Sequence, residues 1–191
     1  MKLSEKEQEE LISGCANGDR KYQQIVFKMY YGKMMGVCMR YAKDQDTAQD
    51  IVQDGFIKVF DKVKGFNGKG SFEGWIRRIM VNTAIDFFRK KKKDFILLED
   101  DSRVEQQEED LDIFDDDSDA FYGIKPAQVM EAMHKLSPAY KTVFNLYVVE
   151  NYTHAEIAEM LEISVGTSKS NLSKAKLNLK KILLNNETKQ L

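Results

Sequence analysis

The sequence predicts an all-α protein of two small helical domains, a four-helix domain and a helix-turn-helix domain, joined by an acidic flexible linker. Apolar residues recur at helical spacing, and the chain has only two prolines and no run typical of a strand. Residues 1–93 carry 19 basic and 12 acidic side chains, residues 94–119 carry 1 and 13, and residues 120–191 carry 9 and 6. The acidic segment has too few clustered apolar residues to fold against its self-repulsion. We therefore expect domains at 1–93 and 125–186 and a linker at 94–124.

The N-terminal domain is expected to contain four helices. Ser4 and Glu7 have the spacing of a capping box and open the first helix, and Gly18 and Asp19 separate it from a second helix over about 20–42. The broad apolar stripe of this second helix is expected to form the core: Tyr22, Ile25, Val26, Met29, Tyr30, Met34, Val37, Cys38 and Tyr41.

A third helix follows, capped by Asp46 or a neighbouring residue. Its inward positions are expected to be Ile51, Val52, Phe56, Val59, Phe60 and Val63. This spacing leaves Asp50, Gln53 and Asp54 together on the outside. Paired carboxylates with no histidine, metal ligand set or nucleophile beside them do not suggest catalysis, so this face favours contact with a basic partner.

A glycine-rich loop precedes the fourth helix. The sequence GFNGKGSFEG holds four glycines in ten residues, which allow the backbone to approach a ligand closely. The helix WIRRIMVNTAIDFFRKKKK then combines an apolar stripe with seven basic residues and only Asp86 as an acid. Aromatic rings beside guanidinium groups and an amide, Asn82, are the groups that hold single-stranded nucleic acid. Core packing explains the apolar residues but not the density of positive charge.

The C-terminal domain contains a helix-turn-helix pattern. Thr153 and Glu156 form a capping box, and after a turn of three to four residues Ser164 caps the second helix. The apolar stripe of the second helix is expected to be Val165, Leu172, Ala175, Leu179 and Ile182, while its charged residues are all lysines: Lys169, Lys174, Lys176, Lys180 and Lys181. A solvated lysine face is the alternative, but the capped helix and tight turn in front favour entry into a DNA major groove.

Cysteines and histidines give no sign of a metal site or an enzyme. Cys15 and Cys38 fall at apolar helix positions without a neighbouring ligand, so we expect small buried hydrophobes rather than a disulfide or metal ligands. His134 and His154 lie far from any acid or nucleophile arrangement, and a solvated role is expected for His154. We expect no catalytic activity, no metal and no cofactor.

Three separated motifs, in order, resemble the extracytoplasmic-function group of bacterial sigma factors: DTAQDIVQDGFIKVF, FEGWIRRIMVNTAIDFFRKKKK and LSPAYKTVFNLYVVENYTHAEIAEMLEISVGTSKSNLSKAKLNLKK. The resemblance covers almost the whole chain except the acidic segment. It implies a protein that joins core RNA polymerase, opens promoter DNA and then leaves. The N-terminal domain would read the −10 element as a melted strand, and the C-terminal domain would read the −35 element as duplex. An anti-sigma factor is a further implied partner, and no small-molecule substrate is implied.

The resemblance also assigns residues, motif by motif. Binding of core polymerase is assigned to Asp50, Gln53, Asp54 and Phe56. Binding of −10 DNA is assigned to Asn67, Lys69, Ser71, Phe72, Trp75, Arg77, Arg78, Asn82 and Arg89. Binding of −35 DNA is assigned to Thr167, Lys169, Ser170, Ser173, Lys174 and Lys176.

The chain departs from the family pattern in the helix-turn-helix. Glu162 stands in the turn where the family usually has glycine, a position that commonly requires positive φ, so a strain of about 1 kcal/mol is expected. Asn171, Lys174 and Lys176 stand where the family prefers arginine. Because lysine lacks the bidentate fork that recognises guanine, the base preference stays open.

Other functions remain open at this point. A stand-alone helix-turn-helix regulator would bind duplex DNA without polymerase, and a helical adaptor or anti-sigma-like protein would bind no DNA. The loop and aromatic-basic helix at 65–93 argue against the first, since a duplex binder needs no stacking surface, and the lysine-only helix argues against the second.

The acidic linker has three interpretations: a solvating tether, a segment that threads the polymerase channel that later carries the transcript, or a segment that folds back over the basic helices. The polar opening MKLSEKEQEE does not resemble a signal peptide, and no eighteen apolar residues run together. We therefore expect a cytoplasmic protein with no membrane insertion.

Overall fold

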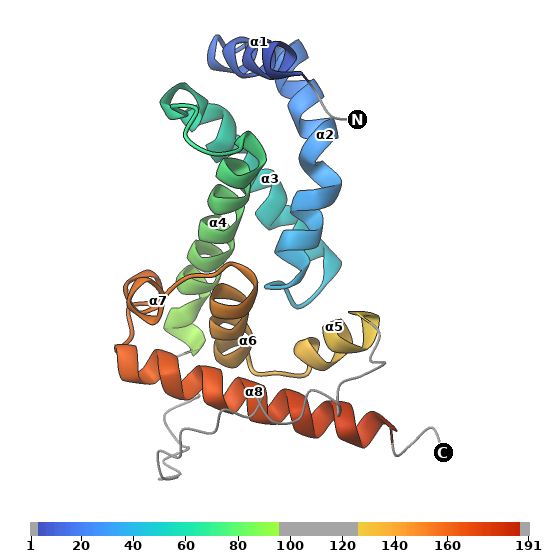
Figure 1. The fold of residues 1–191 in the computed structure, drawn as a ribbon, viewed down its shortest axis with the longest axis vertical. Coiled ribbons are helices and arrows are strands. Elements are labelled where there is room, and N and C mark those ends of the chain that lie inside the picture. The colour runs from blue at the N-terminus through green and yellow to red at the C-terminus, as the bar shows by residue number, and fades with distance from the viewer. Residues whose placement is uncertain (1–3, 96–125, 188–191) are drawn as a thin grey trace. The chain divides into compact units, whose positions relative to one another are not determined.

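The structure is a computed structural model that describes residues 4–95 and 126–187. Within these ranges all regular elements are helices, which confirms the predicted fold class (Figure 1). The chain divides into two compact units, Met1–Lys90 and Lys91–Leu191. The predicted linker, apart from its first two residues in the last turn of α4, lies outside the described residues, so its extent stays a prediction.

Unit 1 contains α1 (Glu5–Ala16), α2 (Arg20–Met39), α3 (Gln45–Lys62), a 3₁₀ turn η1 (Val63–Gly65) and α4 (Phe72–Phe95), whose end runs past Lys90. The predicted capping box of α1 is confirmed, since Ser4 and Glu7 each accept a hydrogen bond from the other's backbone N–H. The cap of α3 is Asp44 rather than Asp46, because its Oδ1 accepts the Thr47 N–H at 2.8 Å. The second helix ends at Met39, three residues earlier than the sequence suggested.

The core of unit 1 is formed by one face from each long helix. The fully buried side chains include Val26 and Met34 of α2, Ile51, Val52 and Val59 of α3, and Ile76 and Met80 of α4. Each such side chain stabilises the fold by about 1.5–3 kcal/mol relative to exposure. The α1 helix is tied to α2 by a hydrogen bond of 2.7 Å from the Tyr22 hydroxyl to Glu10.

Both cysteines are buried in this core, as predicted. Neither forms a disulfide. Burial raises the pKa of Cys15 to about 11 and that of Cys38 to about 12. Both thiols are therefore protonated at neutral pH.

Unit 2 consists of α5 (Pro126–His134), α6 (Pro138–Phe144), a π-helical segment η4 (Asn145–Val149), α7 (His154–Leu161) and α8 (Val165–Glu187). The long α8 packs against α5, α6 and α7, and its buried positions are Ser168, Leu172, Ala175, Leu179 and Leu183. The predicted stripe was wrong at its ends. Val165, the first residue of α8, is 43% exposed, and Leu183 rather than Ile182 is buried.

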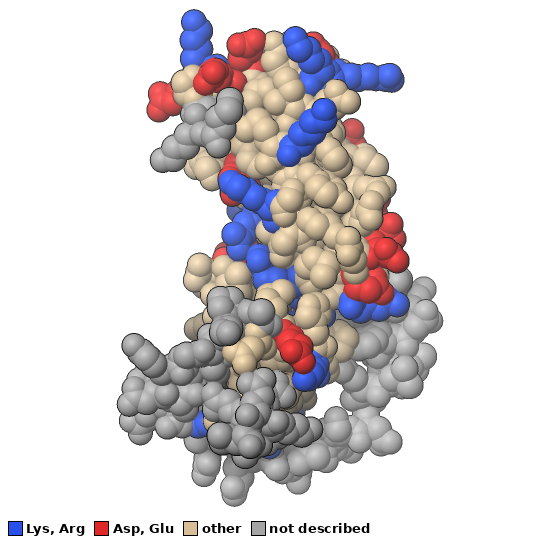
Figure 2. Space-filling model, turned by 90° about the vertical axis from the view of Figure 1, so that its right-hand side faces the viewer, with Lys and Arg blue, Asp and Glu red and all other residues tan. Residues whose placement is uncertain are grey.

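Charged side chains of both signs are scattered over the surface. On the face drawn in Figure 2 uncharged residues cover most of the described surface, and several basic side chains adjoin acidic ones. The α2 helix contributes basic residues and no acidic residue. No helix in the described ranges is both long and apolar enough to span a bilayer.

The contact between α3 and α4 predicts a stability difference between two glycines. A Cβ built at Gly55 of α3 would lie 2.2 Å from Met80 Sδ, whereas one built at Gly36 of α2 would meet nothing within 4 Å. We expect Gly55→Ala to destabilise unit 1 by about 1–3 kcal/mol. Gly36→Ala should stabilise it by about 0.5–1 kcal/mol, because alanine favours a helix interior. Urea unfolding followed by fluorescence of Trp75, the single tryptophan, reports on unit 1 alone, and equal effects of the two changes would contradict the packing.

Candidate nucleic-acid interface

The outer face of α3 presents two carboxylates, an amide and an apolar side chain. Asp50, Gln53 and Asp54 are exposed, and Ile57, one turn further along the same face, is 60% exposed. We call these four residues the α3 face. The sequence analysis did not single out Ile57, although its spacing from Asp50 and Asp54 places it on the same face of the helix.

Phe56 does not belong to this face. Its side chain is only 2% exposed, and its ring lies 4.7 Å from that of Phe27 and 5.9 Å from that of Phe60. The Phe56 side chain, which was expected both to face inward and to bind polymerase, is thus buried in the free chain, and its contact with polymerase stays a prediction. The ring packs α3 against α2.

The glycine-rich loop, residues 66–71, is exposed at its apex and anchored at its base. Gly68 and Gly70 have φ of 74° and 80°, a region that other residues enter at a cost. The Asn67 side chain accepts a hydrogen bond from the Lys69 backbone N–H at 3.1 Å. All residues from Asn67 to Ser71 are exposed, so the predicted side chains Asn67, Lys69 and Ser71 are accessible.

An aromatic cluster forms the base of this loop. The ring of Phe72 lies 5.7 Å from that of Trp75 at an interplanar angle of 12°, and Phe66 lies within 5.5 Å of both rings. Tyr30 of α2 meets the Phe72 ring edge-on at 6.0 Å. Phe72 is only 2% exposed and anchors the cluster, so its predicted contact with DNA stays a prediction that the free chain does not present on its surface. Trp75 is partly exposed.

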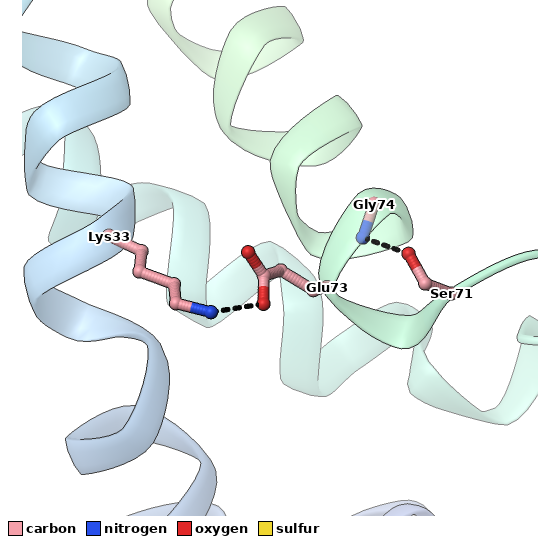
Figure 3. Close-up of polar contacts among 4 residues, drawn as sticks. All are labelled: Lys33, Ser71, Glu73 and Gly74. Atoms are coloured by element: carbon pink, nitrogen blue, oxygen red, sulfur yellow. Dashed lines mark hydrogen bonds and ion pairs between the residues drawn. The ribbon is translucent and has the colours of Figure 1, made fainter. Parts of the chain in front are cut away.

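The first turn of α4 is held from two sides (Figure 3). Ser71 Oγ accepts the Gly74 N–H at 3.0 Å, which satisfies one of the free donors at the helix start. Lys33 of α2 donates to Glu73 at 2.5 Å, and this hydrogen bond raises the pKa of the lysine. The loop is therefore followed by a helix start that is tied to α2.

One side of α4 presents residues at steps of three and four: Trp75, Arg78, Asn82, Asp86 and Arg89. We call this the α4 strip. Arg78, Asn82 and Arg89 are exposed, as predicted for residues that contact DNA. Arg77 was placed with them, but it lies two positions from Trp75 and one from Arg78, so it projects from another side of the helix and is only partly exposed.

The helix-turn-helix forms as the sequence predicts. The Thr153 and Glu156 capping box starts α7, and Ser164 Oγ accepts the Thr167 N–H at 2.9 Å at the start of α8. Between the helices Glu162 has φ 56° and ψ 44°, the left-handed conformation expected for this position. A hydrogen bond from the Ile163 N–H to the Ala158 carbonyl, 3.0 Å, closes the turn.

The predicted DNA-binding residues of α8 divide into two groups. Thr167, Ser170, Ser173 and Lys174 are all exposed and lie opposite the buried stripe; we call them the α8 face. Lys169 is also exposed, whereas Lys176 is half-buried. These two lysines flank the buried side, close enough to His154 for their charges to lower its pKa.

His154 is half-buried and packed on one side, whereas a solvated role was expected. Its ring stacks on Tyr147 with centroids 4.5 Å apart, and its Nδ1 lies 2.9 Å from Ser168 Oγ. Ser168 is a fully buried hydroxyl in the apolar stripe of α8, and this hydrogen bond satisfies it. Burial, followed by Lys169 and Lys176, lowers the pKa of His154. The pair joins α7 to α8, and no sequence signal identified it, because the two residues are fourteen apart.

Comparison with known proteins decides the family. Residues 26–94 match the model of sigma-70 region 2, and residues 127–179 match the model of sigma-70 region 4. The chain is 27% identical over 170 residues to the ECF RNA polymerase sigma-E factor of Haemophilus influenzae, across 87% of this chain and 89% of that protein. It is 34% identical over 147 residues to RNA polymerase sigma factor SigV of Bacillus subtilis, across 77% and 81%. The chain belongs to the extracytoplasmic-function sigma factors.

This membership favours a sigma factor over a stand-alone regulator: the protein is a transcription initiation factor that directs RNA polymerase to promoters. Its fold resembles that of the sigma factor RpoE from Bartonella quintana, solved in complex with the anti-sigma factor NepR, with a TM-score of 0.50, 19% identity and coverage of 84% of this chain and 95% of that one. The region 2 match lies in unit 1 except for residues 91–94, and the region 4 match lies in unit 2. The α3 face and the α4 strip thus lie in region 2, and the α8 face lies in region 4.

The left-handed Glu162 predicts a stabilising substitution. Glu162→Gly should stabilise unit 2 by about 1 kcal/mol, because a side chain in this conformation is strained. Asn151, with φ 58°, is the matched control, since asparagine tolerates this region and should gain less from glycine. Hydrogen exchange of peptides from α7 and α8 measures the change. A larger gain at Asn151, or none at Glu162, would contradict the strain.

The partly buried His154 predicts a pH dependence of stability. Because its folded pKa is lowered, the neutral form of His154 is favoured in the folded state. Its contribution to stability is complete above the unfolded pKa of about 6.5 and diminishes as the pH falls below that value.

We therefore expect the Tm advantage of the wild type over His154→Asn, whose amide reaches the Nδ1 position without titrating, to shrink between about pH 7.5 and pH 5.5. Thermal unfolding followed by circular dichroism measures both proteins at each pH. Ser168→Ala is the control, because it removes the hydrogen bond but keeps the titrating ring. Parallel loss of stability in the wild type and His154→Asn would refute the coupling.

Proposed function

We propose that this sigma factor divides promoter opening among three surfaces. The α3 face binds core RNA polymerase, the glycine-rich loop and the α4 strip capture a base of the melted −10 strand, and the α8 face reads the −35 duplex. The observation that carries the proposal is the arrangement at the start of α4. An exposed loop on an aromatic base leads directly into a helix that presents an amide and two arginines on one side.

Strand capture follows from the chemistry of that arrangement. A base that leaves the stack costs a few kcal/mol, so melting requires a protein surface that recaptures it. The loop apex at Asn67–Gly70 has no bulky side chain except Lys69 and lets a base approach the backbone. Asn82 can donate to and accept from a base edge, and Arg78, one turn earlier, can hold the sugar-phosphate backbone.

The α3 face has the composition of a protein-binding surface. Carboxylates at Asp50 and Asp54 can accept hydrogen bonds from arginine or lysine of a partner. Ile57 supplies an apolar contact beside them, and apolar contacts surrounded by polar groups are common in protein interfaces. A basic surface of polymerase with an apolar centre is the matching partner.

The α8 face supports duplex reading by hydroxyls and a lysine. Thr167, Ser170 and Lys174 follow at steps of three and four, so they can face one groove together. Lys169 and Lys176 lie beside this face and suit phosphate contacts, which carry no sequence information. Because lysines supply the positive charge of this face and its flanks, the affinity of unit 2 for duplex DNA should fall steeply as the salt concentration rises.

We also propose that an anti-sigma factor controls this protein and that it works in the cytoplasm without catalytic activity. The support is the resemblance to RpoE of Bartonella quintana, which was solved with such a partner, and the absence of enzymatic roles in a family of initiation factors. The acidic segment between the regions lies outside the described residues.

Strand capture predicts different responses on closed and pre-melted promoters. Asn82→Ala should bind polymerase normally and reduce open complexes on closed duplex by about tenfold, the equivalent of one lost hydrogen bond. A template with an unpaired −10 bubble should recover most of that activity. Asp50→Lys should stay inactive on both templates, because it removes polymerase binding. Permanganate footprinting and run-off transcription with purified holoenzyme measure the two effects.

Gln24→Ala, which removes an exposed amide of α2, is the control for Asn82 and should change neither template. Losses of Asn82→Ala that are equal on closed and pre-melted DNA would show that the loop and the α4 strip do not act in melting.

A further inference from the structure

The α4 strip contains one carboxylate, Asp86, between Asn82 and Arg89. The strip otherwise presents an aromatic ring, an amide and two arginines. On the proposed function it faces a nucleic-acid strand, which is a polyanion. Residues three and four apart on a helix are neighbours, so an unpaired carboxylate at this position would repel the strand from Asn82. From the sequence alone, the negative charge of Asp86 would therefore oppose the binding of DNA to the α4 strip.

The structure supplies a partner for this carboxylate from another helix. Lys58 Nζ of α3 lies 3.0 Å from Asp86 Oδ2, with the two side chains 37% and 49% exposed. Lys58 directly follows Ile57 but projects from a different side of α3, toward α4. An ion pair with this much exposure contributes little to folding stability. Its larger effect is to cancel the charge of Asp86 on the strip.

We propose that Lys58 is a charge-neutralising residue for strand binding. It acts through Asp86, keeps the α4 strip free of local negative charge, and so permits single-stranded DNA to reach Asn82. It does not contact the DNA itself. This inference rests on the proposed role of the α4 strip.

A double-mutant cycle tests the proposal. The variants are Lys58→Met, Asp86→Asn and the double variant, each assembled with core polymerase. The probe is a short fluorescein-labelled oligonucleotide with the non-template −10 sequence of a promoter that the wild-type holoenzyme transcribes. Lys58→Met should weaken binding by on the order of fivefold, because a charge beside an interface acts over a few ångströms. In the Asp86→Asn background the same change should have no effect.

The control is Lys62→Met, which removes the same charge from an exposed position one turn later on α3 and should leave binding unchanged. An equal loss from Lys58→Met with and without Asp86 would show that Lys58 contacts the strand directly and would overturn the proposal. Equal losses from Lys58→Met and Lys62→Met would overturn it as well. If Lys58→Met lowers the thermal midpoint of the protein and the loss of binding follows from that unfolding, the ion pair has a structural role. This result would also overturn the proposal.

The variant Arg78→Ala distinguishes failure of the proposed role of Lys58 from failure of the proposed function of the α4 strip. If Arg78→Ala leaves oligonucleotide binding unchanged, the α4 strip does not bind the strand and the proposed function fails. If Arg78→Ala weakens binding while the cycle shows no coupling between Lys58 and Asp86, only the role of Lys58 fails. Coupling together with an effect of Arg78→Ala supports both.

Discussion

Burial of Phe72 is the constraint on which the geometry of region 2 depends. The ring stands at the first residue of α4 and packs against Tyr30, Phe66 and Trp75, so it fixes the end of the loop and the rotation of the helix at the same point. Rotation of a helix decides which residues are exposed along its length. A buried ring thus determines that Arg78 and Asn82, four residues apart, point outward.

In region 4 a partly buried hydrogen bond fixes the packing of two helices. The stripe of α8 that packs on α6 and α7 is apolar except for Ser168, whose hydroxyl meets His154 across the helix pair. Apolar contacts alone tolerate small rotations, whereas a buried hydrogen bond is lost when the donor and acceptor separate. This bond therefore fixes the register of the two helices, on which the direction of Thr167 and Lys174 depends.

Local features of this fold could be predicted from the sequence, and long-range ones could not. Both capping boxes and the left-handed Glu162 follow from residues within a few positions of one another, and each formed as expected. Resemblance to a family assigned Phe56 and Phe72 to contacts with polymerase and DNA but carried no information on their burial, and both side chains are only 2% exposed. The pairs His154 with Ser168 and Lys58 with Asp86 join residues fourteen and twenty-eight apart, and periodicity within one helix carries no information about such pairs.

The state of the cysteines bears on how this sigma factor can be regulated. Oxidants attack the thiolate, and the thiolate forms readily only where a cysteine is accessible and its pKa is low. The chain has two cysteines, and both are buried with raised pKa values. The two thiols of the folded chain are therefore poor targets for direct oxidation, so a cysteine-based redox signal would first require this core to open.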